Sequence, residues 1–157
     1  MDAHAEARRL VDAYTPLIMR LGYTYLDSRE DAEDICQETL MKLVRSSSSF
    51  KDEKHERAWI VRVAINTCKD RLKSAARRRN VGLDAVQDTA APSDGPGSVL
   101  EAVQTLPERY REAIYLHYYE GYKIAEIACL TGRSEAAVAK GLSRGREMLR
   151  RTLGDDF

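Results

Sequence analysis

The segment AWIVRVAINTCKDRLKSAARRR, residues Ala58 to Arg79, decides the fold of the N-terminal half of this chain. At the 100° per residue of an α-helix, its side chains divide into two faces. The apolar face is predicted to be buried and consists of Ile60, Val61, Ala64, Ile65, Cys68, Leu72 and Ala75. The opposite face is mostly basic and consists of Trp59, Arg62, Val63, Asn66, Lys69, Asp70, Lys73 and Arg77. The segment is therefore predicted to form a long amphipathic helix.

The basic face of this helix has two interpretations. Its cations suit phosphates, its indole suits base stacking and its amide suits a base edge, so the face fits a nucleic acid. Alternatively, it is a solvated face whose Trp59 side chain packs on a neighbouring element. The helix alone leaves both interpretations open.

The charges of the chain are segregated, although the formal net charge of its 157 residues is zero. Residues 1–50 carry a net charge of −3 and residues 51–80 carry +6, whereas residues 81–108 carry −5 and residues 109–157 carry +2. Two positive segments separated by an acidic one predict two surfaces for a polyanion. The sequence has neither an apolar run of membrane-spanning length nor a signal-peptide pattern at its start. We therefore expect a cytoplasmic protein without membrane insertion.

Residue types that often form enzyme and metal sites are not arranged for either role. Cys36, Cys68 and Cys129 lie far apart beside aliphatic residues, which predicts buried, reduced thiols. His55 and His117 have no companions at metal-ligand spacing. A Ser/His/Asp set, a phosphate-binding glycine loop and paired carboxylates in a plausible cleft are also missing. We expect no enzymatic activity, no bound metal and no cofactor.

Two further helices are predicted before Ala58. Residues 4–26 carry an apolar stripe, with a kink or interruption expected at Pro16. Ser28 is a suitable N-cap for the next helix, whose first turn is acidic. The buried stripe of that helix is predicted to be Ile35, Leu40, Leu43 and Val44. Its exposed face is predicted to be Asp34, Gln37, Glu38 and Lys42, either solvated or docking a basic partner helix.

Polar segments flank the amphipathic helix on both sides. Residues 46–52 form a serine-rich loop in which Asp52 can cap the following helix; the loop is either a plain linker or, with Phe50, part of a pocket. Residues 81–98 are acidic and rich in proline and glycine, which is typical of a flexible linker. The predicted fold is all-α, with two small helical domains, residues 1–80 and 99–157, joined by this flexible acidic linker.

The C-terminal domain is predicted to contain a helix-turn-helix. Short helices are expected over residues 99–105, from Pro107 to Glu120 and over residues 122–130. A tight turn at residues 131–133 leads to Ser134, the N-cap of a last helix. The residues of that helix predicted to face the core are Val138, Leu142 and Leu149. Helix, glycine-containing turn and capped helix together have the helix-turn-helix layout.

Five tyrosines cluster between Tyr110 and Tyr122, in the second of these short helices and at the start of the third. Their helical spacing predicts that most of them belong to the core, and the alternative is an exposed patch for a partner protein. The cluster consists of Tyr110, Tyr115, Tyr118, Tyr119 and Tyr122.

The order of these segments resembles the bacterial sigma factors, in particular the short, two-domain, extracytoplasmic-function type. DAEDICQETLMKL, residues 31–43, resembles the region-2 helix that docks on RNA polymerase. RAWIVRVAINTCKDRL, residues 57–72, resembles the stretch that melts and reads the minus-ten element. LPERYREAIYLHYYEGYKIAEIACLTGRSEAAVAKGLSRGREML, residues 106–149, resembles region 4, which reads the minus-thirty-five element. The resemblance covers nearly the whole chain apart from the linker.

The resemblance implies roles for individual residues. Asp34, Gln37 and Glu38 fall where the family contacts the clamp helices of the largest polymerase subunit. Asn66 and Asp70 fall where the family reads single-stranded bases, and the 46–52 loop falls where it binds a flipped-out base. The implied minus-ten contacts are Phe50, Trp59, Arg62, Asn66, Lys69, Asp70, Lys73 and Arg77, with Arg78 and Arg79 as further phosphate contacts. Binding bases as they unstack would melt a duplex without ATP.

The last helix departs from the family pattern near its base-reading turn. The family usually has larger, often basic side chains there, whereas this chain has small ones, namely Ala136, Ala137, Ala139, Gly141 and Gly145. Either the helix lies unusually close to the duplex, or minus-thirty-five recognition is weak and dominated by phosphates, which we favour. A third possibility is a region 4 that binds a partner and seldom touches DNA. The predicted minus-thirty-five contacts are Arg133, Ser134, Lys140, Ser143, Arg144 and Arg146.

The leading hypothesis is a sigma factor that directs promoter recognition and melting. Its expected partners are core RNA polymerase, promoter DNA and, as a candidate implied by the resemblance, an anti-sigma factor. The alternative is a stand-alone helix-turn-helix transcriptional regulator with an N-terminal interaction module. Affinity for core polymerase distinguishes the two.

Overall fold

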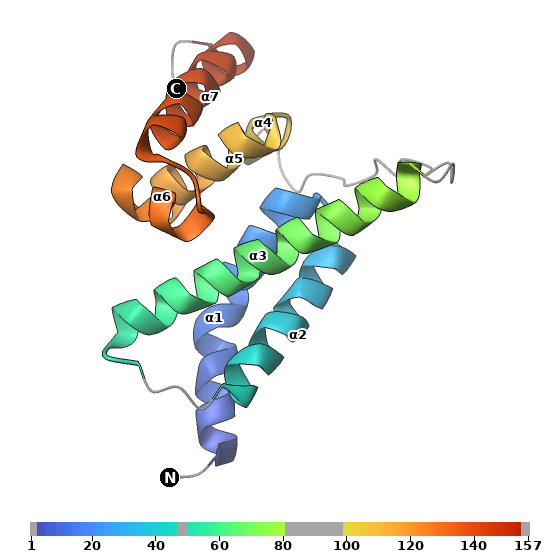
Figure 1. Cartoon of the computed structure of the whole chain (residues 1–157), viewed down its shortest axis with the longest axis vertical. Coiled ribbons are helices and arrows are strands. Elements are labelled where there is room, and N and C mark those ends of the chain that lie inside the picture. The colour runs from blue at the N-terminus through green and yellow to red at the C-terminus, as the bar shows by residue number, and fades with distance from the viewer. Residues whose placement is uncertain (1–2, 47–49, 81–98, 155–157) are drawn as a thin grey trace. The chain divides into compact units, whose positions relative to one another are not determined.

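The computed structural model describes residues 3–46, 50–80 and 99–154, and the side chains at 3, 78–80 and 100 are outside this description. These residues form helices joined by short turns and caps, and no strand occurs in the described ranges. The all-α prediction is confirmed. The chain divides into two compact units, Met1–Ala91 and Pro92–Phe157. Figure 1 shows the helices of each unit.

The first unit is a bundle of three helices, α1 (Ala3–Leu26), α2 (Arg29–Arg45) and α3 (Glu53–Asn80). Each helix packs against the other two, and α3 crosses both of its neighbours (Figure 1). The bundle core takes side chains from all three helices, among them Ile18, Leu21, Ile35, Ile60 and Ile65. The predicted apolar face of α3 supplies much of this core, and its Leu72 and Ala75 are half-buried at the edge.

Two predicted caps begin the helices of this bundle. The Ser28 hydroxyl accepts a hydrogen bond from the Asp31 backbone N–H at 3.2 Å. The Asp52 carboxylate accepts one from the His55 backbone N–H at 2.9 Å. Each side chain satisfies a backbone donor that the first helical turn leaves without an intrahelical partner.

Pro16 lies inside α1, which continues through it without the interruption that was one of the two expected outcomes. The burial expected for part of α2 is wrong. Val44 was expected in the buried stripe of α2 but is 60% exposed, because it lies in the last turn of the helix and lines a surface cavity instead of the core. Leu40 is only half-buried. The buried residues of α2 are Ala32, Ile35, Cys36, Thr39 and Leu43.

The second unit contains α4 (Val99–Gln104), α5 (Glu108–Ile114), a π-helical turn η1 (Tyr115–Tyr119), α6 (Ile124–Thr131) and α7 (Glu135–Leu153). The helix-turn-helix is formed by α6 and α7. Its turn contains Gly132 at φ 73°, a left-handed conformation that glycine adopts without a steric penalty. The Ser134 hydroxyl then accepts a hydrogen bond from the Ala137 N–H at 3.0 Å, which confirms the predicted cap of α7.

The predicted inward residues of α7, Val138, Leu142 and Leu149, are all buried. The expectation for the tyrosine cluster is wrong in part. Tyr115 and Tyr122 are buried, but Tyr118 and Tyr119 are 49% and 44% exposed. The reason is η1, which continues α5 as a wider turn where a regular helix was expected up to Glu120, and so changes the direction of the side chains that follow. The predicted burial of Cys129 is also wrong.

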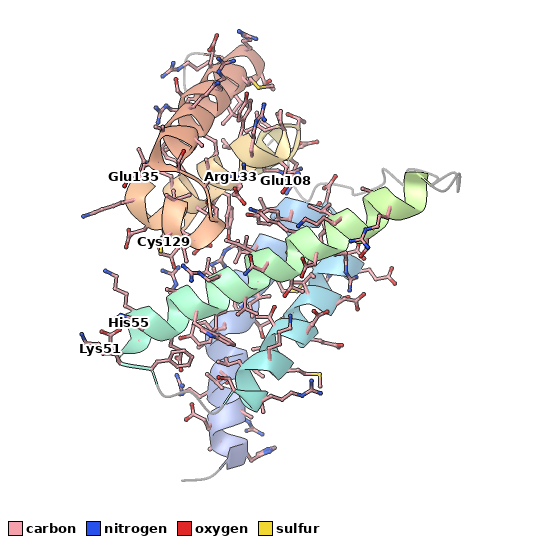
Figure 2. All side chains as sticks on the ribbon, viewed as in Figure 1. Lys51, His55, Glu108, Cys129, Arg133 and Glu135 are labelled. Atoms are coloured by element: carbon pink, nitrogen blue, oxygen red, sulfur yellow. The ribbon has the colours of Figure 1, made fainter. Side chains whose placement is uncertain are left out.

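Cys129 is exposed, whereas Cys36 and Cys68 are buried as expected. On α6 it lies between Ile127 and Leu130, which face the core, so its own side chain points outward (Figure 2).

Candidate nucleic-acid and polymerase interfaces

The basic face of α3 lies at the surface. Arg62, Asn66, Asp70, Lys73 and Arg77 are exposed, and Trp59, Val63 and Lys69 are half-buried. By contrast, Ile60, Val61, Ala64, Ile65 and Cys68 on the opposite face have no exposed area. Neither the indole nor the amide is sealed inside the bundle. The structure therefore keeps this face available for a ligand.

An aromatic pair stands at the N-terminal end of this face. The rings of Phe50 and Trp59 have centroids 5.8 Å apart and planes tilted by 58°, a favourable geometry for two aromatic side chains. Both residues are half-buried. Phe50 precedes α3 and Trp59 belongs to it, so the contact joins the end of the serine-rich loop to the helix. The indole thus packs on a neighbour and also remains partly open to a ligand.

A cavity of about 930 Å³ borders Phe50 and is lined by α1, α2 and the start of α3. Its apolar lining includes Leu10, Leu43 and Val44, and its charged lining residues are Arg9 and the four acids Glu6, Asp52, Glu53 and Glu56. This acidic excess disfavours phosphate and leaves the basic face of α3 as the side for a nucleic-acid backbone.

Three of these carboxylates, those of Glu6, Asp52 and Glu56, are hydrogen-bonded. Arg9 pairs with Glu6 and with Glu56, at 2.5 and 3.1 Å. Burial raises the pKa of Glu56, but hydrogen bonds from Arg9 and Tyr14 outweigh it, so the pKa is lowered overall. The backbone N–H and the ring of His55 hold the pKa of Asp52 below its usual value. Figure 2 shows Lys51 and His55 projecting outward at the start of α3.

The predicted docking residues Asp34, Gln37 and Glu38 are exposed on α2. Asp34 lies 3.2 Å from the Arg71 guanidinium of α3. Glu38 lies 3.3 Å from the Lys42 ammonium, which also donates to the Thr67 hydroxyl at 3.2 Å. Exposed ion pairs contribute at most about 1 kcal/mol, so a partner cation can replace Arg71 or Lys42 at small cost. Sequence reasoning missed Arg71, because its role depends on how α3 packs on α2.

The predicted minus-thirty-five residues divide into two groups. Lys140, Ser143 and Arg144 are exposed on one face of α7 at spacings of three and four residues. The other three make contacts inside the unit. Ser134 caps α7, Arg146 donates to the Tyr118 hydroxyl at 2.8 Å, and Arg133 donates from Nε to Glu112 at 2.8 Å. The Glu112 side chain is 1% exposed, so Arg133 neutralises a buried charge.

The glycines of α7 face another helix of the same unit. A Cβ at Gly141 would lie 3.3 Å from the Arg109 carbonyl oxygen. One at Gly145 would lie 2.8 Å from Cγ1 of Ile114, closer than real Cβ atoms approach. Both glycines therefore permit the close packing of α5 on α7, and they need not be explained by DNA. The small residues that remain exposed on α7 are Ala136, Ala137 and Ala139.

Comparison with known proteins matches both units to one family. Residues 10–78 match the family model for Sigma-70 region 2, and residues 97–149 match that for Sigma-70 region 4. The chain is 31% identical to the ECF RNA polymerase sigma factor SigM of Mycobacterium tuberculosis over 138 residues, covering 86% of this chain and 70% of the relative. The chain belongs to the extracytoplasmic-function (ECF) sigma factors.

Further relatives extend the match along the chain. The RNA polymerase sigma factor SigW of Bacillus subtilis is 28% identical, over 98% of this chain and 90% of its own length. The fold is similar to that of the sigma factor RpoE from Bartonella quintana, solved in complex with the anti-sigma factor NepR. That structure has a TM-score of 0.77 and 21% identity, and the alignment covers 96% of this chain and 98% of that one.

Family membership decides between the two hypotheses for function. As a sigma factor, the chain binds core RNA polymerase and promoter DNA and directs the initiation of transcription. The region-2 match spans most of the three-helix unit. The alternative hypothesis, a stand-alone regulator, assigned this unit only a general interaction role, so the match favours the sigma factor. No helix in the described part of the chain is long and apolar enough to cross a membrane.

Proposed function

We propose that this sigma factor opens promoter DNA by binding the displaced strand along the basic face of α3. The proposal rests on one observation: Asn66 and Asp70 are exposed, with the exposed cations Arg62, Lys73 and Arg77, on a helix whose other face is buried from Ile60 to Cys68. Asn66 and Asp70 are one helical turn apart, so both can face the same strand. The amide of Asn66 can both donate to and accept from a base edge, and the carboxylate of Asp70 can accept from an exocyclic amine.

The Phe50–Trp59 pair gives this strand an apolar surface for stacking. Its two rings are fixed against one another and remain partly exposed. Stacking of a base on an aromatic side chain contributes ~1–3 kcal/mol, which is comparable to the cost of unstacking it from the duplex. Arg62, Lys69, Lys73 and Arg77 would hold the phosphates along the same face. Melting then needs no ATP and no catalytic residue, so we propose a non-enzymatic role.

The residues proposed to dock on core polymerase are Asp34, Gln37 and Glu38. Their exposure supports this role, as do the exposed ion pairs with Arg71 and Lys42, which keep the carboxylates oriented toward cations. A basic helix of core polymerase would exchange its own cations for these two. Gln37, between the two acids, adds directional hydrogen bonds.

Upstream recognition falls to Lys140, Ser143 and Arg144 of α7. Because the residues before them are alanines, few side chains on this helix can reach a base edge. We therefore propose that minus-thirty-five binding is dominated by phosphates and discriminates weakly between sequences. The protein would act in the cytoplasm, where the polymerase is. An anti-sigma protein that covers an exposed patch such as Tyr118 and Tyr119 is the regulator we propose.

Reconstitution with core RNA polymerase tests this function. The chain should co-purify with the core enzyme and stimulate run-off transcription from promoters found by transcript mapping. Absence of stimulation on every template would overturn the proposal. Tight duplex binding by the isolated chain without affinity for core polymerase would also overturn it.

A further inference from the structure

A cationic cluster where α5 meets α7 includes two residues that were not among the predicted contacts, Arg109 and Tyr110. It consists of Arg109 and Tyr110 on α5 and Lys140 and Arg144 on α7. The Arg109 guanidinium carbon is 5.2 Å from the centroid of the Tyr110 ring, so the cation lies against the aromatic face. The three cations are exposed and Tyr110 is half-buried.

Two glycines explain why residues of α5 lie beside Lys140 and Arg144. Gly141 and Gly145 each follow one of these cations in the sequence. A Cβ at Gly141 would lie 3.3 Å from the Arg109 carbonyl oxygen and 3.8 Å from Cδ1 of Tyr110. A Cβ at Gly145 would lie 3.6 Å from Cβ of Tyr110. The first turn of α5 therefore rests directly on α7, next to its exposed basic residues.

The electrostatics agree with this placement. A hydrogen bond from Arg109, together with the charges of Arg109, Arg144 and Lys140, lowers the pKa of Tyr110 below its ordinary value. The three cations thus act together on one phenol oxygen. Elsewhere in this unit, Arg133 and Arg151 are instead held in ion pairs with Glu112 and Glu147.

We propose that Arg109 and Tyr110 bind a phosphate of promoter DNA and so extend the upstream contact from α7 onto α5. A guanidinium offers two parallel donors to a phosphate, and a tyrosine hydroxyl offers a third. The cluster is continuous with Lys140 and Arg144, which the proposed function already assigns to DNA, and the inference rests on that assignment. A phosphate contact supplies affinity without sequence information, which suits a recognition helix whose outer face is poor in long side chains.

The test uses holoenzyme reconstituted from the full chain and core polymerase, with a duplex promoter taken from transcript mapping. Binding is measured over a salt series for Arg109→Ala, Arg109→Lys and Tyr110→Phe. Arg151→Ala serves as the control, because it removes an exposed cation of α7 that pairs with Glu147 and lies outside the cluster. Far-UV circular dichroism and assembly with core polymerase are recorded for each variant.

Arg109→Ala should reduce the slope of log affinity against log salt by about 0.9 and weaken binding several-fold at low salt. The loss should be equal for promoters that differ in the minus-thirty-five sequence. Arg109→Lys should restore the slope, Tyr110→Phe should lose less affinity, and Arg151→Ala should match the wild type.

If the salt slope of Arg109→Ala is unchanged, the inference is overturned. The proposed function still stands in that case, provided that the wild-type holoenzyme initiates transcription. Impaired assembly with core polymerase at an unchanged slope shows that the cluster binds protein, which also overturns it. Failure of the wild-type holoenzyme to initiate at any promoter counts against the proposed function and the inference together.

Discussion

Arg133 and Glu112 form an ion pair that links the turn of the helix-turn-helix to α5. The Arg133 Nε donates to Glu112 at 2.8 Å, and the Glu112 side chain is 1% exposed whereas that of Arg133 is 34% exposed. The contact fixes the start of α7 relative to the helix on which it packs. Arg133 was predicted to contact DNA, but this pair also gives it a structural role. A binding assay of Arg133 variants must therefore distinguish a lost DNA contact from a destabilised fold.

Arg133→Ala should lower the stability of the second unit by about 2–3 kcal/mol. Removal of one partner leaves the Glu112 carboxylate buried without its cation, which costs ~3–5 kcal/mol for a fully buried pair and less for this half-open one. Hydrogen exchange of peptides from α5 to α7 measures the loss. Fluorescence of Trp59, the single tryptophan, reports the first unit and should not change. Unaltered exchange in the second unit would contradict the prediction.

Gly145→Ala should destabilise the second unit by about 1–2 kcal/mol. An exposed Gly→Ala change within a helix stabilises it by up to about 1 kcal/mol. Here the new methyl group would lie 2.8 Å from Cγ1 of Ile114, and overpacking costs ~1–3 kcal/mol. Thr152→Ala, at an exposed position of α7, is the control and should change stability by less than about 0.5 kcal/mol. Greater stability of Gly145→Ala would refute the packing role.

Asn66→Ala should impair promoter opening in a sequence-dependent way. A good side chain–base hydrogen-bond pair contributes ~1–3 kcal/mol to discrimination, so opening should fall about 10- to 100-fold on promoters whose base it reads. Permanganate footprinting of holoenzyme complexes measures opening, and co-purification measures polymerase binding, which should persist. Ser74→Ala, also exposed on α3, is the control. An equal loss on all promoters would rule out base reading.

Glu38→Lys or Asp34→Lys should weaken competition for core polymerase at least tenfold. Each change places a cation against the basic partner helix and against Lys42 or Arg71, and like charges at an interface cost several kcal/mol. Competition against a labelled sigma factor measures the effect, while circular dichroism should show an intact fold. Asp12→Lys, an equivalent change at an exposed acid of α1, should compete normally. Normal competition by Glu38→Lys and Asp34→Lys would refute the docking role.

Asp52→Asn should lower the stability of the first unit above about pH 4, and the difference should vanish in acid. The His55 backbone N–H holds the pKa of Asp52 below its ordinary value of 3.8. The charged cap therefore stabilises the fold above that value, and its contribution is lost as the pH falls through the lowered pKa. Urea midpoints from Trp59 fluorescence at several pH values measure this. A difference of the same size far below pH 3 would contradict a role for the charge.

Local rules sufficed for much of the fold and part of the site. The two faces of α3 follow from helical periodicity, and the Ser28, Asp52 and Ser134 caps follow from side-chain chemistry within three residues. These features depend only on residues that are close together in the sequence, so one sequence is enough to predict them.

Features that depend on packing were not predictable. Val44 and Cys129 lie on helices of the expected kind, but which flank of a helix is covered is decided by another element. Arg71 with Asp34 and Arg133 with Glu112 are ion pairs between segments distant in sequence, so Asp34 and Arg133 were assigned only to partners outside the chain, and Arg71 and Glu112 were missed. The glycines of α7 were interpreted only in relation to DNA, as a close approach to the duplex or as weak recognition, because their packing on α5 is not visible in the sequence.

The π-helical turn at Tyr115–Tyr119 closes with a hydrogen bond from the Glu120 N–H to the Tyr115 carbonyl, five residues back. One residue there is surplus to an ordinary helical repeat. Removing it would restore an ordinary helical repeat, so the side chains of this turn would leave α5 in different directions, and Glu120 would move relative to the Tyr115 hydroxyl that donates to it. Insertion or loss of a single codon at this point is therefore a short evolutionary route by which a descendant of this chain can present a different aromatic surface while the preceding helix stays in place.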